Sequence, residues 1–495
     1  MQQPAAIVLG NYIARETLVD LPPDVIEAAN DCLLDSFGCL LGGYTLPIAS
    51  ILDGFLDDLA SRGDVQIIGS DRRTDPGTAA FVHACLINAL DFDDIYRKGH
   101  PGATVVSAAL SAAARTNSYG TDLLEAIVVG YEVSGRIAMS LKHLHPRKTL
   151  HGHGTWQVLG AAAAVAKLLK LNGRQSANAL AIAAANAPVA SVMKTVYGAA
   201  PTMAKNNFGT AAQTGLTAAF LARNGFEGPL DIFEGNTGFW RMAGADACEF
   251  EYLTAGLGHI YEIREVGFKP FSCCRILQSS IQASVKVLRK AGINPRDRTY
   301  EKLVVTAPQI VCESPFNNPA PADIWAAQFS APYTIALALL DIKAGPDWFL
   351  ETQMRDDVVA SLMMKIKLLP NTDKTISGSH HISRAWLYLK DGQIFDSEVK
   401  IALGEAANPL PRSFLKEKFV KLAKRRLGTK PALGLLRSIV DIASVSSIRS
   451  LLVETVPLNP HPADSDQTVS EKTCACEFLC SGGSSVCAPS PKETL

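Results

Sequence analysis

The chain carries almost no net charge and no long apolar run. Its 47 lysine and arginine residues nearly balance its 48 aspartate and glutamate residues, so the formal net charge is −1. No overall field would draw it to nucleic acid or to an anionic membrane, and an anionic ligand has to be held by a local cluster of cations. No stretch approaches the ~18 consecutive apolar residues of a membrane span. We therefore expect neither a nucleic-acid partner nor a membrane partner.

Recognisable targeting signals are also missing. The N-terminal Met1-Gln2-Gln3-Pro4 has neither the basic region and apolar core of a signal peptide nor the arginine-rich character of a transit peptide. The final residues, Lys492-Glu493-Thr494-Leu495, match no retention or peroxisomal signal. We therefore expect a cytoplasmic protein.

The eleven cysteines give no clear disulfide or zinc framework. Seven are scattered through the body of the chain and, in a cytosolic protein, are most simply reduced thiols. The other four crowd the tail with the spacing Cys-x-Cys-x3-Cys-x6-Cys, which fits no standard zinc pattern and has no accompanying histidine. Free thiols in a disordered tail are the favoured interpretation, with a metal clip or reversible lipidation as alternatives. These four are Cys474, Cys476, Cys480 and Cys487.

What the chain does have is a large apolar content arranged with helical periodicity. Hydrophobic residues make up 47% and charged residues 19% of its 495 residues, which is typical of a globular protein with a substantial core. Small residues are dense in the segments 160–171, 174–187 and 211–224, and they let neighbouring helices approach closely. Beyond Ile263 strand-like runs appear, including a hairpin signal at Asp391-Gly392.

The order of these patterns predicts a mainly α fold, with a discontinuous all-helical domain and an inserted smaller α+β lid domain. Residues 1–265 and 401–458 would form the helical domain, and residues 266–400 the lid. Residues 459–495, rich in Pro, Ser, Gly and Thr, would form a disordered tail that contains the four clustered cysteines.

Two histidine-bearing segments are candidates for chemistry. In the first, Asp91-Phe92-Asp93-Asp94 precedes His100-Pro101, and the proline forces the histidine out of helical geometry, so it can point into a cleft. The structural alternative is a solvated helix end with a capping aspartate. In the second, His151-Gly152-His153-Gly154 stands before an alanine-rich helix, whose N-terminus favours anions. Zinc bound by these histidines and a carboxylate is a weaker alternative, because no third ligand is signalled nearby.

Two further segments each hold a lysine in an uncharged setting. Lys205 lies in Met203-Ala204-Lys205-Asn206-Asn207-Phe208-Gly209, and Lys269 in Lys269-Pro270-Phe271-Ser272-Cys273-Cys274-Arg275. An isolated lysine of this kind usually extends its ammonium to solvent. If both converge with the histidines, they form a pocket for carboxylates.

Taken in order, these four segments resemble the MmgE/PrpD family, which includes 2-methylcitrate dehydratases, cis-aconitate decarboxylases and related epimerases. The Asp-rich run before His100-Pro101, the position of His151, and Lys205 followed by small residues all resemble family motifs. Lys269 to Arg275 is close to the family's Lys-Pro-Tyr-x-Cys-Cys-Arg, and Gln328 to Tyr333 resembles its tyrosine-bearing segment. The resemblance runs from about residue 5 to residue 455, and within the family it is closer to the decarboxylases.

The resemblance implies a homodimeric lyase that acts on a small polycarboxylate without a cofactor or a metal. The favoured reaction is decarboxylation of cis-aconitate or a related alkylaconitate. The alternatives are dehydration of 2-methylcitrate or an alkylcitrate, epimerisation of a dicarboxylate, and an inactive binding homologue. The predicted catalytic residues are His100, His151, Lys205, Tyr333 and Asp91, and the predicted substrate-binding residues are Lys269, Arg275 and Asp94.

Overall fold

The computed structural model describes residues 3–97, 99–142, 150, 151, 153–188, 191, 192, 202–297, 299–371 and 382–457. For residues 150, 151, 191, 192 and 202–206 it describes the backbone alone. The predicted disordered tail, 459–495, lies outside the described residues. The seven cysteines outside the tail form no disulfide within the described part of the chain.

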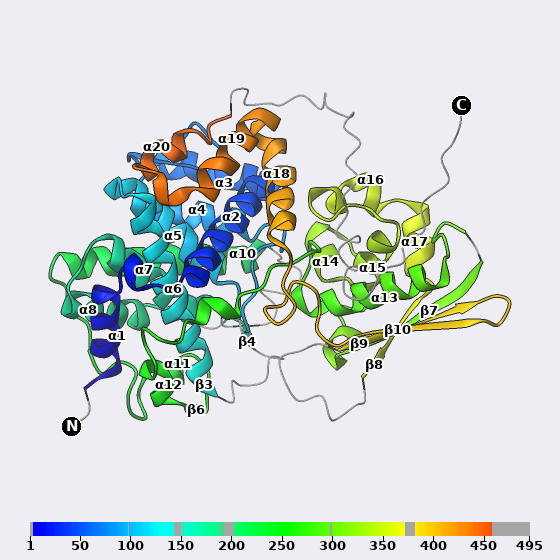
Figure 1. The fold of residues 1–495 in the computed structure, drawn as a ribbon, viewed down its shortest axis with the longest axis horizontal. Coiled ribbons are helices and arrows are strands. Elements are labelled where there is room, and N and C mark those ends of the chain that lie inside the picture. The colour runs from blue at the N-terminus through cyan, green and yellow to red at the C-terminus, as the bar shows by residue number, and fades with distance from the viewer. Residues whose placement is uncertain are drawn as a thin grey trace.

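Most of the described chain is helical, as predicted, and the N-terminal helices form one large packed unit (Figure 1). Its longer helices are α1 (Ala5–Arg15), α2 (Pro23–Gly43), α3 (Ile48–Leu59), α4 (Pro76–Ile87), α5 (Pro101–Thr116), α6 (Gly120–Ser140), α7 (His153–Leu168), α8 (Gly173–Ala185) and α10 (Thr202–Arg223). Two shorter helices follow, α11 (Phe239–Met242) and α12 (Phe250–Thr254). Two-residue strands pair between them: β1 (Val65–Gln66) with β2 (Arg73–Thr74), β3 (Leu141–Lys142) with β6 (Ala247–Cys248), and β4 (Leu150–His151) with β5 (Ser191–Val192).

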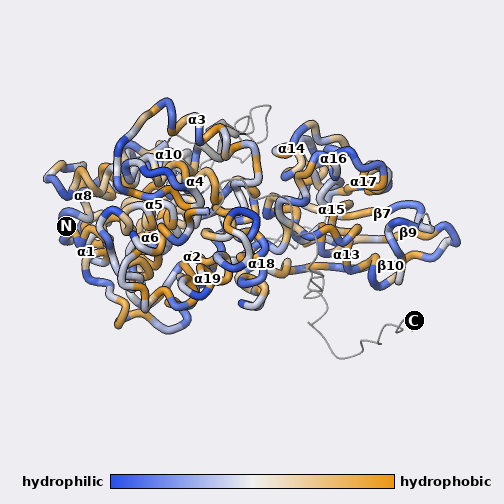
Figure 2. Tube along the Cα trace, turned by 90° about the horizontal axis from the view of Figure 1, so that it is seen from above, coloured by the Kyte–Doolittle hydropathy of each residue, from blue (hydrophilic) through white to orange (hydrophobic). Residues whose placement is uncertain are grey.

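Small residues set the spacing of the central helices. A Cβ atom added to Gly130 of α6 would lie 2.9 Å from the carbonyl oxygen of Gly160 in α7, and one added to Gly160 would lie 2.6 Å from that of Gly130. The two helices therefore touch backbone to backbone at this crossing, which only glycine allows. Helices α5 and α6 run through the middle of this unit as largely hydrophobic segments (Figure 2).

The second part of the chain adds a four-stranded mixed sheet with strand order β10-β9-β7-β8. Its strands are β7 (Tyr300–Ala307), β8 (Ile366–Pro370), β9 (Ser383–Leu389) and β10 (Ile394–Val399), and β7 and β8 are the parallel pair. The hairpin predicted at Asp391-Gly392 is confirmed, with Tyr388 opposite Ile394 and a positive φ of 90° at Gly392. Helix α13 (Gln278–Ala291) packs on β9 and β10, and α15 (Ala331–Leu339) packs on α13 and on α17 (Asp357–Met363). Two shorter helices of this part are α14 (Ile324–Phe329) and α16 (Glu351–Met354).

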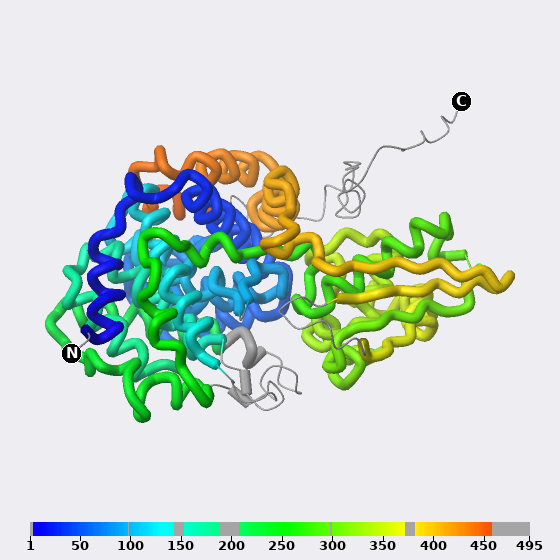
Figure 3. The backbone as a smooth tube through the Cα atoms, turned by 60° about the horizontal axis from the view of Figure 1, so that its bottom comes forward, coloured from blue at the N-terminus to red at the C-terminus, as the bar shows by residue number. Residues whose placement is uncertain are grey.

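The last helices return to the first ones (Figures 1 and 3). The returning segment contains α18 (Arg412–Leu427), α19 (Thr429–Val440) and α20 (Ile448–Val453). Helix α18 packs on α2 so closely that a Cβ atom on Gly38 would lie 3.2 Å from the Cα atom of Phe419. The strands β9 and β10 extend away from this helical unit on the opposite side of the molecule (Figure 3). The predicted domain boundaries and the role of residues 266–400 as a lid stay predictions.

No single described helix is long and apolar enough to cross a membrane, although the bent pair Pro23–Gly43 and Ile48–Leu59 meets that test by length and composition alone.

Candidate active site

Two segments that are far apart in the sequence meet beside the C-terminal end of α4. The loop that leads from α4 to His100 pairs with the segment around Lys269 through Ile95 and Gly267, which exchange two backbone hydrogen bonds of 2.8 Å. Ser272 then donates its hydroxyl to the carbonyl oxygen of Leu90 at 2.8 Å. The first and fourth of the predicted motifs are therefore neighbours in space.

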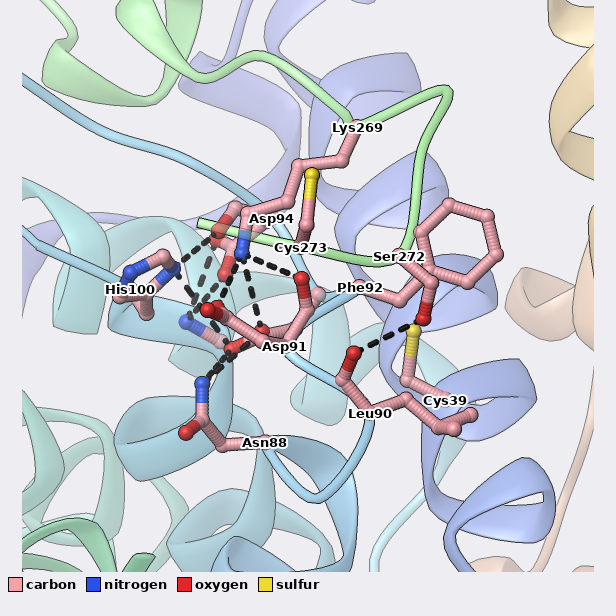
Figure 4. A network of polar contacts seen from close by, with 12 residues as sticks. Cys39, Asn88, Leu90, Asp91, Phe92, Asp94, His100, Lys269, Ser272 and Cys273 are labelled. Atoms are coloured by element: carbon pink, nitrogen blue, oxygen red, sulfur yellow. Dashed lines mark hydrogen bonds and ion pairs between the residues drawn. The ribbon is translucent and has the colours of Figure 1, made fainter. Parts of the chain in front are cut away.

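Lys269 and the aspartates of the first motif form a buried charge cluster (Figure 4). The Lys269 ammonium lies 2.6 Å from Oδ1 of Asp91 and 3.6 Å from Oδ1 of Asp93, and it also donates to the Asp91 carbonyl oxygen at 2.8 Å. Burial opposes the charge of Lys269, but the two carboxylates outweigh it and raise the pKa of this lysine. Asp91 has a φ of 48°, a left-handed conformation that is uncommon outside glycine and is often found at functional sites.

His100 lies at the edge of this cluster. As predicted, it leaves helical geometry, with φ −132° and ψ 74°, and α5 begins at Pro101. Its Nδ1 lies 2.8 Å from the carbonyl oxygen of Asp94 and 3.8 Å from Oδ2 of Asp93. A carbonyl only accepts, so Nδ1 carries the hydrogen in this contact and Nε2 is the nitrogen left to exchange a proton with a substrate. Burial, and next the charge of Lys269, lower the pKa of His100.

Asp94 and Asp93 support the loop in different ways. The Asp94 carboxylate accepts from the backbone N–H of Gly102, at 3.1 and 3.2 Å, and from the Tyr131 hydroxyl at 2.8 Å, so it holds the first turn of α5. Burial and the neighbouring Asp93 raise the pKa of Asp94 well above its ordinary value. Asp93 accepts two hydrogen bonds of 2.9 Å from the side-chain amide of Asn88.

A second buried lysine, which the sequence analysis did not identify, also holds this loop. The Lys418 ammonium of α18 lies 2.6 Å from Oδ1 of Asp35 and 2.5 Å from the carbonyl oxygen of Phe92. Its position could have signalled this role, because Lys418 shares a helical face with the buried Leu415, Phe419 and Leu422. A lysine on a buried face needs a carboxylate partner.

On its other side, His100 meets residues of α7 and α10. Its ring centroid lies 5.6 Å from that of His153 and 6.0 Å from that of Phe208. Gln157, four residues after His153 in α7, lies against Gly99, and Asn207 of α10 lies against Gly154. The sequence analysis predicts His151 as a site residue and does not include His153, Gln157 or Asn207. The spacing of four residues between His153 and Gln157, which puts both on one helix face, is the signal that could identify Gln157.

The remaining predicted residues are placed differently. Arg275 forms an ion pair with Glu405, with contacts of 2.9 and 2.6 Å, and also donates to the carbonyl oxygens of Tyr96 and Arg97. Tyr333 is fully buried, and its hydroxyl donates to the carbonyl oxygen of Trp348. The side chains of His151 and Lys205 lie outside the described residues. The roles predicted for these four residues stay predictions.

The composition of the buried cluster indicates whether a metal ion would fit there. Among the residues that the structure describes, ligand atoms of Asp91, Asp93 and His100 lie within 4.8 Å of one another, which is close enough to bind one metal ion. However, the Lys269 ammonium already lies between the two carboxylates, at 2.6 and 3.6 Å, and supplies positive charge there. A metal ion at this point would be repelled by that ammonium group, so these residues do not suit one.

Comparison with known proteins gives a consistent result. The family model of the MmgE/PrpD N-terminal domain matches residues 8–250, and that of the MmgE/PrpD C-terminal domain matches residues 271–438. A cis-aconitate decarboxylase of Homo sapiens is 27% identical over 444 residues, which cover 86% of this chain and 90% of the relative. A cis-aconitate decarboxylase-like protein of Aspergillus oryzae is 25% identical over 472 residues, covering 90% and 95%. A mitochondrial 2-methylcitrate dehydratase of Yarrowia lipolytica is 23% identical over 409 residues, covering 77% and 76%. The chain therefore belongs to the MmgE/PrpD family.

Proposed function

We propose that this protein is a lyase that decarboxylates cis-aconitate or a related alkylaconitate. Family membership supports the lyase class, since the relatives above are named as decarboxylases and a dehydratase. The observation that carries the proposal is the setting of His100. Its Nδ1 is held by the Asp94 carbonyl oxygen beside the buried cluster of Asp91, Asp93 and Lys269, which leaves Nε2 for the substrate.

The reaction needs one proton and one place for electron density. When the bond between carbon and the departing carboxylate breaks, carbon dioxide leaves, and the electron pair passes into the adjacent unsaturated acid. His100 or His151 then delivers a proton to carbon, which gives a product with one carboxylate fewer. Lys205, Lys269 and Arg275 are the predicted cations for the carboxylates, with Asp94 and Tyr333 as predicted hydrogen-bonding groups and Asp91 as the predicted orienting acid.

Dehydration of 2-methylcitrate or an alkylcitrate is the second candidate. The lowered pKa of His100 favours it, because a neutral imidazole can take an α-proton at neutral pH. Epimerisation and an inactive binding homologue are weaker candidates. The predicted homodimer, cytoplasmic location and lid role of residues 266–400 belong to the same proposal. Size-exclusion chromatography with light scattering tests the dimer.

The decisive experiment follows purified protein by NMR with cis-aconitate, 2-methylcitrate and an alkylcitrate. Release of carbon dioxide with an exomethylene product supports decarboxylation, and loss of water supports dehydration. Turnover of none of them contradicts both. A parallel sample treated with a chelator tests metal dependence, and loss of activity that metal restores would overturn the metal-free mechanism.

The pH dependence of kcat/KM separates the two roles of His100. As a proton donor it must be protonated, so activity falls as pH rises through a pKa below the ordinary 6.5. As a base it must be neutral, so activity rises over the same range and then levels off. His100→Ala should abolish turnover while leaving thermal stability nearly unchanged. Full activity in that variant would remove His100 from the mechanism.

A further inference from the structure

The charged groups of the described site are largely engaged with one another. Lys269 is paired with Asp91 and Asp93, and Arg275 with Glu405. A substrate carboxylate that bound either cation would have to compete with these protein carboxylates. Donors that have no protein partner within the described residues face no such competition.

Two buried amides beside His100 offer such donors. Gln157 and Asn207 are 1% and 6% exposed, and within the described structure their side-chain nitrogens, Nε2 and Nδ2, have no hydrogen-bond partner. Buried polar nitrogens are nearly always hydrogen-bonded in folded proteins, because an unmade bond leaves the desolvation of the group uncompensated. Two buried donors without an acceptor among the described residues are consistent with a binding site in which the ligand supplies the acceptor.

The orientation of Gln157 is fixed by its neighbours. The Thr104 hydroxyl donates to Oε1 of Gln157 at 3.1 Å, which turns Nε2 toward the loop that carries His100. A Cβ atom added to Gly99 would lie 2.3 Å from this Nε2 and 3.7 Å from Cγ of His153. The donor therefore lies directly against the residue that precedes His100.

Asn207 reaches the same region from α10. It contacts α7 at Gly154, where a Cβ atom added to the glycine would lie 2.3 Å from Oδ1 of Asn207. The ring of the next residue, Phe208, lies 6.0 Å from the ring of His100 and 6.3 Å from that of His153. Gln157 thus lies against the residue before His100, and Asn207 lies against the residue after His153.

We propose that Gln157 and Asn207 are specificity-determining residues that donate hydrogen bonds to a carboxylate of the substrate beside His100. This inference rests on the proposed function. Both unpaired atoms are N–H donors, so the group that they bind must be an acceptor, and carboxylates are the acceptors of a polycarboxylate. A neutral amide can bind a carboxylate without disturbing the ion pairs of Lys269 and Arg275.

The test compares Gln157→Leu, made together with Thr104→Val, against a matched control. The control is Asn178→Ala in α8, a buried amide whose Oδ1 already accepts from the backbone N–H of Gly228 at 3.2 Å. We expect the control to lose thermal stability with an unchanged KM. The Gln157 variant should keep or gain thermal stability, because an unsatisfied donor is removed, while kcat/KM for the polycarboxylate falls about tenfold or more through KM.

Two further variants sharpen the result. Asn207→Leu should repeat the loss in kcat/KM, again with stability retained. Gln157→Glu replaces the donor by a carboxylate, and repulsion should make its KM higher than that of Gln157→Leu. If Gln157→Glu is no worse than Gln157→Leu, the bound group is not anionic, and the carboxylate assignment is overturned.

The failure of this inference differs from the failure of the proposed function. Wild-type turnover of cis-aconitate or an alkylcitrate, with KM unchanged in both the Gln157→Leu and Asn207→Leu variants, overturns the inference alone. If the wild-type protein neither turns over any polycarboxylate nor gains thermal stability with cis-aconitate or citrate, the proposed function falls, and the inference falls with it.

Discussion

Replacing Lys269 by methionine tests whether this lysine stabilises the fold. Methionine has a similar length but no charge, so Lys269→Met leaves Asp91 and Asp93 buried without their cation. The lysine side chain is 0% exposed and its ammonium lies 2.6 Å from Asp91. Removing one partner of a buried ion pair costs about 3–5 kcal/mol, because the remaining charge stays desolvated. We expect a loss of that size in the free energy of unfolding.

A surface pair provides the control. Arg264 contacts Asp24 at 2.6 and 2.9 Å, a geometry as short as that of Lys269, but the two side chains are 40% and 62% exposed. Arg264→Met should therefore cost no more than about 1 kcal/mol. Urea unfolding, monitored by circular dichroism, compares the free energy of unfolding of both variants with that of the wild-type protein. Adding Asp91→Asn to Lys269→Met should recover part of the loss, since it removes one of the two uncompensated charges.

The comparison can refute the reasoning directly. If Lys269→Met destabilises the protein no more than Arg264→Met, the buried cluster does not stabilise the fold, and Lys269 is available to the substrate. The pH dependence gives a second check. The carboxylates raise the pKa of Lys269 in the folded state, so its stabilisation is fully present at neutral pH. It should be lost only when the pH rises beyond the ordinary range of lysine.

Three further predictions concern the loop around His100. Asp94→Asn should be tolerated, because burial already favours the neutral acid. Asp94→Leu should lower the free energy of unfolding in urea by about 1–3 kcal/mol, because it leaves the Gly102 N–H and the Tyr131 hydroxyl unpaired. Equal losses in the two variants would contradict this. Arg275→Met should lower kcat and thermal stability together, because it frees both Glu405 and the carbonyl oxygens of the loop; a change in KM alone would indicate substrate binding instead. A bound polyanion should raise the pKa of His100, so calorimetric titration with cis-aconitate in buffers of different ionisation enthalpy should show proton uptake, and a buffer-independent enthalpy would exclude it.

Several elements of this fold and site could be predicted because their signals are local. The proline after His100 disfavours helical geometry for the histidine, and the structure confirms that the histidine is not helical. Asp391-Gly392 fixes the β9–β10 hairpin through the positive φ of the glycine. Dense small residues indicated close helix packing, which the crossing at Gly130 and Gly160 confirms.

Other features depend on contacts between distant residues, and no local pattern contains them. Lys269 lies 178 positions from Asp91, and nothing in its own segment shows that the chain itself supplies its partner carboxylate. The same holds for Arg275 and Glu405, which are 130 positions apart. The role proposed for Gln157 rests on a hydrogen bond that its Nε2 lacks within the described structure, which a sequence cannot display.

The charge balance of the buried cluster agrees with the proposal that groups outside it bind the substrate. Among the side chains that the structure describes, Lys269 pairs with Asp91 and Asp93 and Lys418 pairs with Asp35, while Asp94 accepts from the neutral donors Gly102 N–H and Tyr131 hydroxyl. Fully ionised, the set would carry two excess negative charges and would repel a polycarboxylate. Burial raises the pKa of Asp35 and Asp94, which opposes this build-up of negative charge. A cluster whose charges are paired in this way can fix the orientation of His100 without attracting anions, which agrees with the proposal that the amides on the other side of His100 donate to the substrate.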